Sequence, residues 1–198
     1  MATDVVTLIQ EDHRLLEGLF AALQAGEGDR RAVVDEVAAR LNAHSRAEER
    51  EVYPAITKAD PGENEEVDHG YSEHREAEHL LEKVRNLVES EHFEQALTEF
   101  VDAVTHHVEE EESEILPALR KAVDAKTLRQ LGDAFAAARA RELEKAGLAA
   151  GVSAADAPAD DLGDATRDEL YEKAKEADIP GRSGMKKDEL AEALREQE

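Results

Sequence analysis

The chain has 198 residues, a length that suits one domain of ordinary size or one domain with a small appendage. It contains no cysteine, which excludes disulfides, thiolate metal sites and cysteine nucleophiles. Its 24 basic and 48 acidic residues give a formal charge of −24, so the surface as a whole repels nucleic acid and anionic membranes. Since neither a signal peptide nor an apolar run of membrane-spanning length stands out, we expect a cytoplasmic protein with no membrane partner.

The first stretch, residues 4–25, has apolar side chains that recur mostly at spacings of three and four. This period predicts an amphipathic helix. Thr3 or Asp4 can cap its start, and Gly26 suits its end.

Three further helices follow at short intervals. Asp29 can cap the second, which should end near Pro54, and Asn64 can cap the third. Ser90 can start the fourth, which should end near Pro117. Long helices joined by short loops favour antiparallel neighbours, so we predict an all-α, up-down four-helix bundle.

A fifth helix, capped by Thr127, should pack on the outside of this bundle, and the bundle domain should span residues 1–145. Residues 146–163 are rich in small residues, Gly, Asp and Pro, and are predicted to form a flexible linker. Residues 164–198 then contain two short helical patterns separated by Gly and Pro, which predicts a small helix–extended loop–helix.

One twelve-residue motif occurs twice, at residues 44–55 and 107–118. The two copies share six positions at an offset of 63: His44/His107, Glu48/Glu111, Glu49/Glu112, Glu51/Glu114, Pro54/Pro117 and Ala55/Ala118. A His and a Glu four residues apart lie on one face of a helix, separated by roughly 40°. Two such pairs on two helices can converge on one point, as in the di-iron sites of helical bundles.

Two more histidines are expected at the same height in the bundle as His44 and His107. His13 lies about ten residues into the first helix, and His44 lies ten residues before Pro54, so an antiparallel pair brings the two histidines to the same height. His74 and His107 match in the same way in the second half of the chain. Four imidazoles and two carboxylates suit iron, and also manganese or zinc. We therefore predict the metal ligands His13, His44, Glu48, His74, His107 and Glu111, with both glutamates bridging.

The sequence leaves alternatives to this ligand set open. His106 with Glu110 and His74 with Glu78 have the same four-residue spacing, although the repeat alignment selects His107 and Glu111. A further alternative without any metal is that the duplicated His–Glu pairs are ion pairs on the surface.

Other polar residues near the motif are less strongly indicated. His69 and His79 are weak ligand candidates, and His92 should be solvated. Tyr53 and Tyr71 could reach the site layer, although we interpret both as packing residues. The remaining motif glutamates are expected to be exposed charges: Glu49, Glu51, Glu112 and Glu114.

The pattern His13, His44-x3-Glu48, His74, His107-x3-Glu111 resembles the hemerythrin-like HHE cation-binding domain over roughly residues 3–145. The resemblance implies a four-helix bundle with two non-haem iron ions per chain and a protein that binds or senses O2, peroxide or nitric oxide in a stress response. A sensing or binding role is favoured over an enzyme. The alternatives are a peroxide-degrading or oxidase di-iron enzyme, and a nucleic-acid-tethered stress protein. The chain departs from oxygen-carrying hemerythrin because Glu78 stands four residues after His74, where a fifth histidine would stand.

Residues 164–196 resemble the SAP and Rho N-terminal modules. That resemblance implies a possible nucleic-acid partner, with Arg182, Lys186 and Lys187 as candidates for phosphate contacts. The alternative is a small protein-interaction or stabilising appendage. No Gly-rich phosphate loop or Ser-His-Asp arrangement stands out, so no catalytic residue is assigned.

Overall fold

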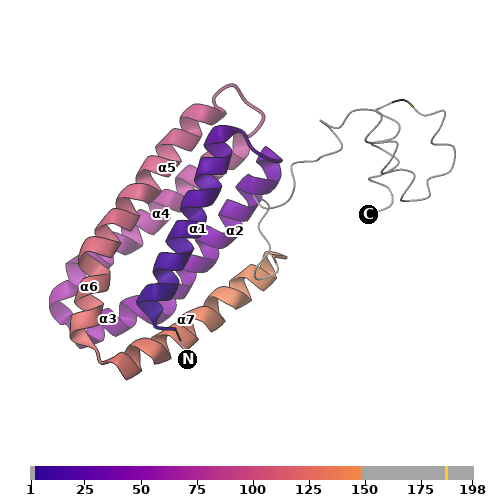
Figure 1. The fold of residues 1–198 in the computed structure, drawn as a ribbon. Coiled ribbons are helices and arrows are strands. Elements are labelled where there is room, and N and C mark those ends of the chain that lie inside the picture. Colours follow the sequence, from indigo (N-terminus) through magenta and orange to yellow (C-terminus); the bar gives the residue numbers. More distant parts are fainter. Residues whose placement is uncertain (1–2, 149–185, 187–198) are drawn as a thin grey trace, which may run out of the picture. The chain divides into compact units, whose positions relative to one another are not determined.

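The computed structural model describes residues 3–148 and Lys186. The described residues form the predicted all-α bundle. Its long helices are α1 (Val5–Ala25), α2 (Arg30–Ala47), α4 (Asn64–Asn86) and α5 (Phe93–Glu110), which Figure 1 shows side by side as an up-down bundle. None of the described helices is both long and apolar enough to cross a bilayer.

Two short helices extend α2 and α5 beyond the positions at which we expected them to end. A π-helical turn, η1 (Glu48–Val52), leads into α3 (Tyr53–Ala59), and a second, η3 (Glu111–Ile115), leads into α6 (Leu116–Ala122). The prediction that helices stop near Pro54 and Pro117 is therefore wrong. Each proline lies in the first turn of α3 or α6, directly after a π turn, and the chain stays helical past it.

The helix starts follow capping chemistry, with two differences from the sequence prediction at α4 and α5. Asp4 and Asp29 accept hydrogen bonds from the first turns of α1 and α2, and Gly26 ends α1 in the left-handed conformation at φ 70°, all as expected. Asn64 is the first residue of α4 rather than its cap, because the 3-10 turn η2 (Pro61–Glu63) precedes it. Ser90 also does not start α5, since a turn occupies the residues up to His92.

The last described helix, α7 (Ala125–Lys145), is capped by Asp124 and not by Thr127, whose backbone N–H donates to the Asp124 carboxylate. It packs along α1 and α2, outside the four-helix bundle as expected. Phe135 is nevertheless completely buried, so α7 contributes to the core. The linker at residues 146–163 and the module at residues 164–198 lie, apart from residues 146–148 and Lys186, outside the described residues.

The core consists of two apolar clusters separated by a polar layer. Leu16 of α1 and Leu41 of α2 belong to one cluster, while Ile9 of α1 and Ala47 of α2 belong to the other. His13 and His44 lie between these residues in the sequence of their helices. Water is therefore excluded from the polar layer on both sides.

Candidate metal centre

The six side chains predicted as ligands all lie in this polar layer. Each is buried, with exposures of 0 to 5%. Their candidate ligand atoms form two groups, within each of which all atoms lie within 4.8 Å of one another: His13, His44, Glu48 and Glu111 in the first, and Glu48, His74 and His107 in the second. Glu48 belongs to both groups, whereas Glu111 belongs to the first alone.

The Nε2 atoms of the histidines point at the carboxylates and at one another. In the first group, Nε2 of His13 lies 3.2 Å from Oε2 of Glu111, and Nε2 of His44 lies 3.2 Å from Oε2 of Glu48. In the second, Nε2 of His74 lies 3.4 Å from the same Glu48 oxygen and 3.1 Å from Nε2 of His107. Such separations are those of neighbouring ligand atoms around one ion with bonds of roughly 2.0–2.2 Å.

A second set of carboxylates lies against Nδ1, the other ring nitrogen, of each of the four buried histidines. Nδ1 lies 2.8 Å from Glu112 in His13, 3.4 Å from Asp12 in His44, 3.1 Å from Glu49 in His74 and 2.8 Å from Glu73 in His107. An Nδ1–H that donates to a carboxylate leaves Nε2 with a free lone pair directed into the layer. This is the arrangement that orients imidazoles as metal ligands.

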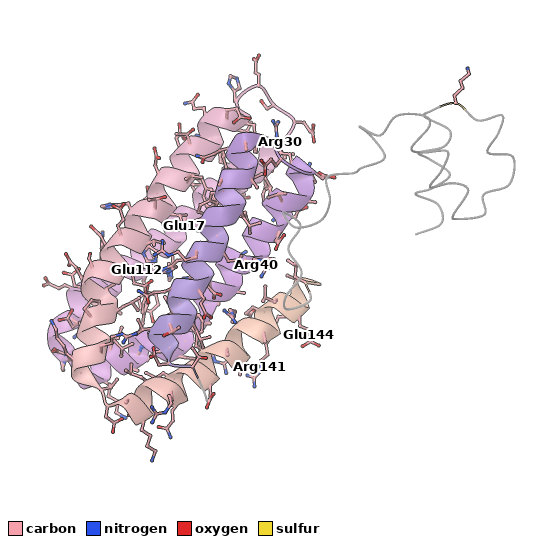
Figure 2. All side chains as sticks on the ribbon, in the orientation of Figure 1. Glu17, Arg30, Arg40, Glu112, Arg141 and Glu144 are labelled. Atoms are coloured by element: carbon pink, nitrogen blue, oxygen red, sulfur yellow. The ribbon has the colours of Figure 1, made fainter. Side chains whose placement is uncertain are left out.

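Two of these carboxylates also bind arginines nearer the surface. Glu112 accepts from Arg14 at 2.6 and 2.7 Å, and Figure 2 shows Glu112 on the side of the bundle where α5 faces α1. Asp12 accepts from Arg139 of α7, and the Phe135 ring meets the His44 ring edge-on at 6.0 Å. Helix α7 thus supports one of the candidate ligands.

Burial and neighbouring charges together shift the pKa values in this layer strongly. Burial, and after it the charge of Glu111, raise the pKa of Glu48 well above its usual range. Burial lowers the pKa of His44 to about 4. Burial also opposes the charge on His13, but the Glu111 and Glu48 carboxylates outweigh it and raise the His13 pKa to about 9. A cation placed among these groups would favour the ionised form of both carboxyls.

Five buried polar atoms of the layer make no hydrogen bond of regular geometry among the described residues, although Nε2 of His13 lies 3.2 Å from Oε2 of Glu111. They are Nε2 of His13 and all four carboxylate oxygens of Glu48 and Glu111. Buried polar atoms are normally paired, and a buried carboxylate without compensation is costly. A bound cation would satisfy all five atoms, and the nitrogen and oxygen donors present suit iron, manganese or zinc.

The structure shows which of the alternative ligand candidates reach the buried layer. Glu78 is exposed and lies 3.9 Å from Arg46, and His79 and His92 are also exposed, so none of the three reaches the layer. His106 pairs with Glu110 on the surface, as the repeat alignment predicted. His69 lies in a separate, outer group with Glu73 and Glu110.

One expectation about the surroundings of the site is wrong, and one alternative for Tyr53 is favoured over packing alone. Glu49 and Glu112 are not simply exposed charges, because each binds a histidine of the layer. Tyr53 does more than pack, because it is fully buried and its hydroxyl lies 3.4 Å from Nε2 of His74. Sequence reasoning also missed Asp12 and Glu73. Each directly precedes a candidate ligand, His13 or His74, a shared position that could have drawn attention to both.

Comparison with known proteins agrees with this geometry. The model of the hemerythrin HHE cation binding domain matches residues 4–119, and that of the Rho termination factor N-terminal domain matches residues 161–198. A crystal structure of a hemerythrin HHE cation binding domain-containing protein from Mycobacterium kansasii covers 97% of this chain and 99% of its own, with a TM-score of 0.63 and 20% sequence identity. At that identity the likeness concerns the fold.

A curated relative, described as a DNA nickase from Nostoc sp., is 26% identical over 148 residues. The match includes 73% of this chain but spans only 41% of the length of that relative. The family match covers more than half of the chain, and it coincides with the helices that bring the buried histidines and glutamates together. The chain belongs to the hemerythrin HHE cation-binding domain family, and its buried cluster supports metal binding.

Proposed function

We propose that this chain holds a centre of two metal ions, with His13, His44, His74 and His107 as terminal ligands and Glu48 and Glu111 as bridging carboxylates. The observation that carries this proposal is the set of five converging buried atoms that make no hydrogen bond of regular geometry among the described residues. Their neighbours lie at separations of 3.1–3.4 Å, which suit common coordination.

The metal in this proposal is iron. Four imidazoles with two carboxylates form a donor set typical of di-iron centres in helical bundles, although manganese and zinc accept the same donors. When bound, iron supplies redox chemistry and open coordination positions for O2, peroxide or nitric oxide. The chain's own residues hold the ions, fix the tautomers of the four histidines and exclude bulk water from the layer.

The role that we assign to this centre is binding or sensing of such a small oxidant. Glu78 stands where oxygen-carrying hemerythrin has a further histidine, and its side chain is exposed and does not reach the layer. Because Glu78 adds no donor and Glu111 lies in the first group alone, the second group has fewer close His and carboxylate donors than the first in the described structure, and it is where an external ligand would bind.

Metal analysis of the purified, iron-loaded protein tests this proposal. We expect about two iron ions per chain and a near-ultraviolet oxo-to-iron absorption band in the oxidised state. His44→Ala and Glu111→Ala should lose metal, while His92→Ala, which changes an exposed histidine, should retain it. Fewer than one metal ion per chain would contradict the proposal.

The enzymatic alternative acts at the same site. Peroxide disproportionation would release oxygen, and this activity should disappear in His44→Ala and Glu111→Ala. A metal-loaded protein that releases no oxygen from peroxide would leave binding or sensing as the function.

A second candidate function is attachment to nucleic acid through the C-terminal module. The Rho N-terminal match over residues 161–198 favours it, and the DNA nickase relative is consistent with it. In this proposal residues 1–145 form the metal-binding domain, residues 146–163 the linker and residues 164–198 the module. Arg182, Lys186 and Lys187 would contact phosphates, against the repulsion of a chain with formal charge −24.

A gel shift with DNA and RNA tests the module. Full-length protein should bind at low salt, and a variant with alanine at positions 182, 186 and 187 should bind more weakly. Equal mobility of nucleic acid with full-length protein and with residues 1–148 would reject the tethering role.

A further inference from the structure

Tyr53 breaks the internal symmetry of the metal layer. Each half of the chain contributes two histidines and one glutamate at matching positions, but Leu116 occupies the position in the second motif that Tyr53 occupies in the first. Tyr53 is the first residue of α3, directly after the π-helical turn η1, and it is completely buried. A buried phenol on one side of the layer makes the two proposed metal positions chemically different.

Several contacts position this phenol at the second group. Its ring stacks on the His74 ring at an interplanar angle of 14°, and its oxygen lies 3.4 Å from Nε2 of His74. The Tyr71 ring meets it edge-on at 5.0 Å. On α4, Gly70 leaves room for the hydroxyl, because a Cβ at residue 70 would lie 2.7 Å from the phenol oxygen.

The distances around Nε2 of His74 are those of one coordination sphere. This nitrogen lies 3.1 Å from Nε2 of His107, 3.4 Å from Oε2 of Glu48 and 3.4 Å from the Tyr53 oxygen. Ligand atoms bound at roughly 2.0–2.2 Å to one ion are separated by about these distances. In the described structure Glu111 lies in the first group alone, so the second group contains three close His and Glu donors where the first contains four, and the phenol lies on the side with fewer.

We propose that the phenol oxygen of Tyr53 is a further protein ligand of the metal ion held by His74 and His107, in addition to the proposed bridging glutamates. The phenol O–H bond breaks, its proton leaves to the solvent, and an oxygen lone pair forms the bond to the metal without any change of oxidation state. The anionic oxygen stabilises the oxidised ion and occupies a position that an external ligand would otherwise take. This inference rests on the proposed metal centre.

The test uses the full-length chain, loaded with ferrous iron under anaerobic conditions and then oxidised to the ferric state. A phenolate bound to ferric iron produces a visible charge-transfer band, and excitation into that band enhances tyrosine ring modes in resonance Raman spectra. We expect both signals in the wild-type protein and their loss in Tyr53→Phe at unchanged iron content. Tyr71→Phe is the matched control and should retain both, since its hydroxyl donates to the backbone of Glu49 instead.

Gly70→Ala supplies an independent check, because the added Cβ would displace the phenol oxygen while leaving every proposed ligand in the sequence. We expect the visible band to shift or disappear at unchanged iron content. An iron-loaded wild-type protein without a visible band, or a Tyr53→Phe protein that keeps the band, would overturn this inference and leave the metal centre intact. A chain that takes up no iron would overturn both proposals.

Discussion

At the scale of single residues, the layer is organised as four imidazole–carboxylate pairs. On α1 and α4 the carboxylates are Asp12 and Glu73, each of which directly precedes a histidine of its own helix and pairs with a histidine of another. In η1 and η3 they are Glu49 and Glu112, each of which directly follows a candidate bridging glutamate. Every pair joins side chains from different helices. The donor and acceptor roles of all four imidazoles are thereby set by residues outside the proposed ligand set.

Glu112→Gln should weaken metal binding without removing a proposed ligand. The amide keeps the size of the side chain but loses the charge that holds both His13 and Arg14. Loss of such an outer partner costs about 10- to 100-fold in affinity, and the near-isosteric change should lie near the lower end. Competition against a chelating indicator measures it. Glu114→Gln, an exposed neighbour in η3, should bind as the wild type does, and equal affinity of the two variants would contradict the assigned role of Glu112.

At the scale of elements, the π-helical turns and α7 adapt a simple bundle to the site. In each π turn, the backbone carbonyl of the candidate bridging glutamate accepts a hydrogen bond from the N–H five residues later. Glu48 accepts from Tyr53, and Glu111 accepts from Leu116. π turns often occur at functional sites because they reorient the side chains that follow. Helix α7 then packs against α1 and α2 and brings Arg139 to Asp12.

Gly132→Ala should destabilise the protein by interfering with this docking of α7. A Cβ at residue 132 would press against the backbone carbonyl of Thr3 and lie 3.1 Å from the backbone nitrogen of Val5, and backbone atoms cannot yield as side chains do. Overpacking of this kind costs about 1–3 kcal/mol. Gly18→Ala is the matched control. Its Cβ would have no atom within 4 Å, so it should stabilise helix α1 by up to about 1 kcal/mol. Denaturant unfolding measures both, and equal effects of the two substitutions would contradict the packing argument.

At the scale of the whole molecule, the metal layer divides the core into two apolar clusters. Two carboxyl groups at 0% exposure between those clusters oppose folding unless a positive charge compensates them. Because a ligand that binds only the folded state stabilises it, metal binding and folding should be thermodynamically coupled in this protein.

Removal of metal should therefore lower the melting temperature. At a hundredfold excess of metal over its dissociation constant the stabilisation is about 2.7 kcal/mol, or roughly 5–10 °C for a chain of this size. Glu48→Gln, which replaces a carboxyl whose ionisation is opposed by burial, should abolish this metal-dependent increase and leave the chelated protein at least as stable as the chelated wild type. Calorimetry with and without chelator measures both. A wild-type melting temperature that does not respond to metal would contradict the coupling.

The amino-acid sequence alone was sufficient for the bundle and for the meeting of His13, His44, His74, His107, Glu48 and Glu111, because a four-residue spacing defines a helix face and antiparallel helices match heights. The assignment of those six residues as metal ligands stays a prediction. The involvement of Tyr53, Glu49 and Glu112 depended on tertiary packing. Their partners lie on other helices, at distances set by how the helices pack and by where a π turn rotates the chain, neither of which leaves a periodic signal in the sequence.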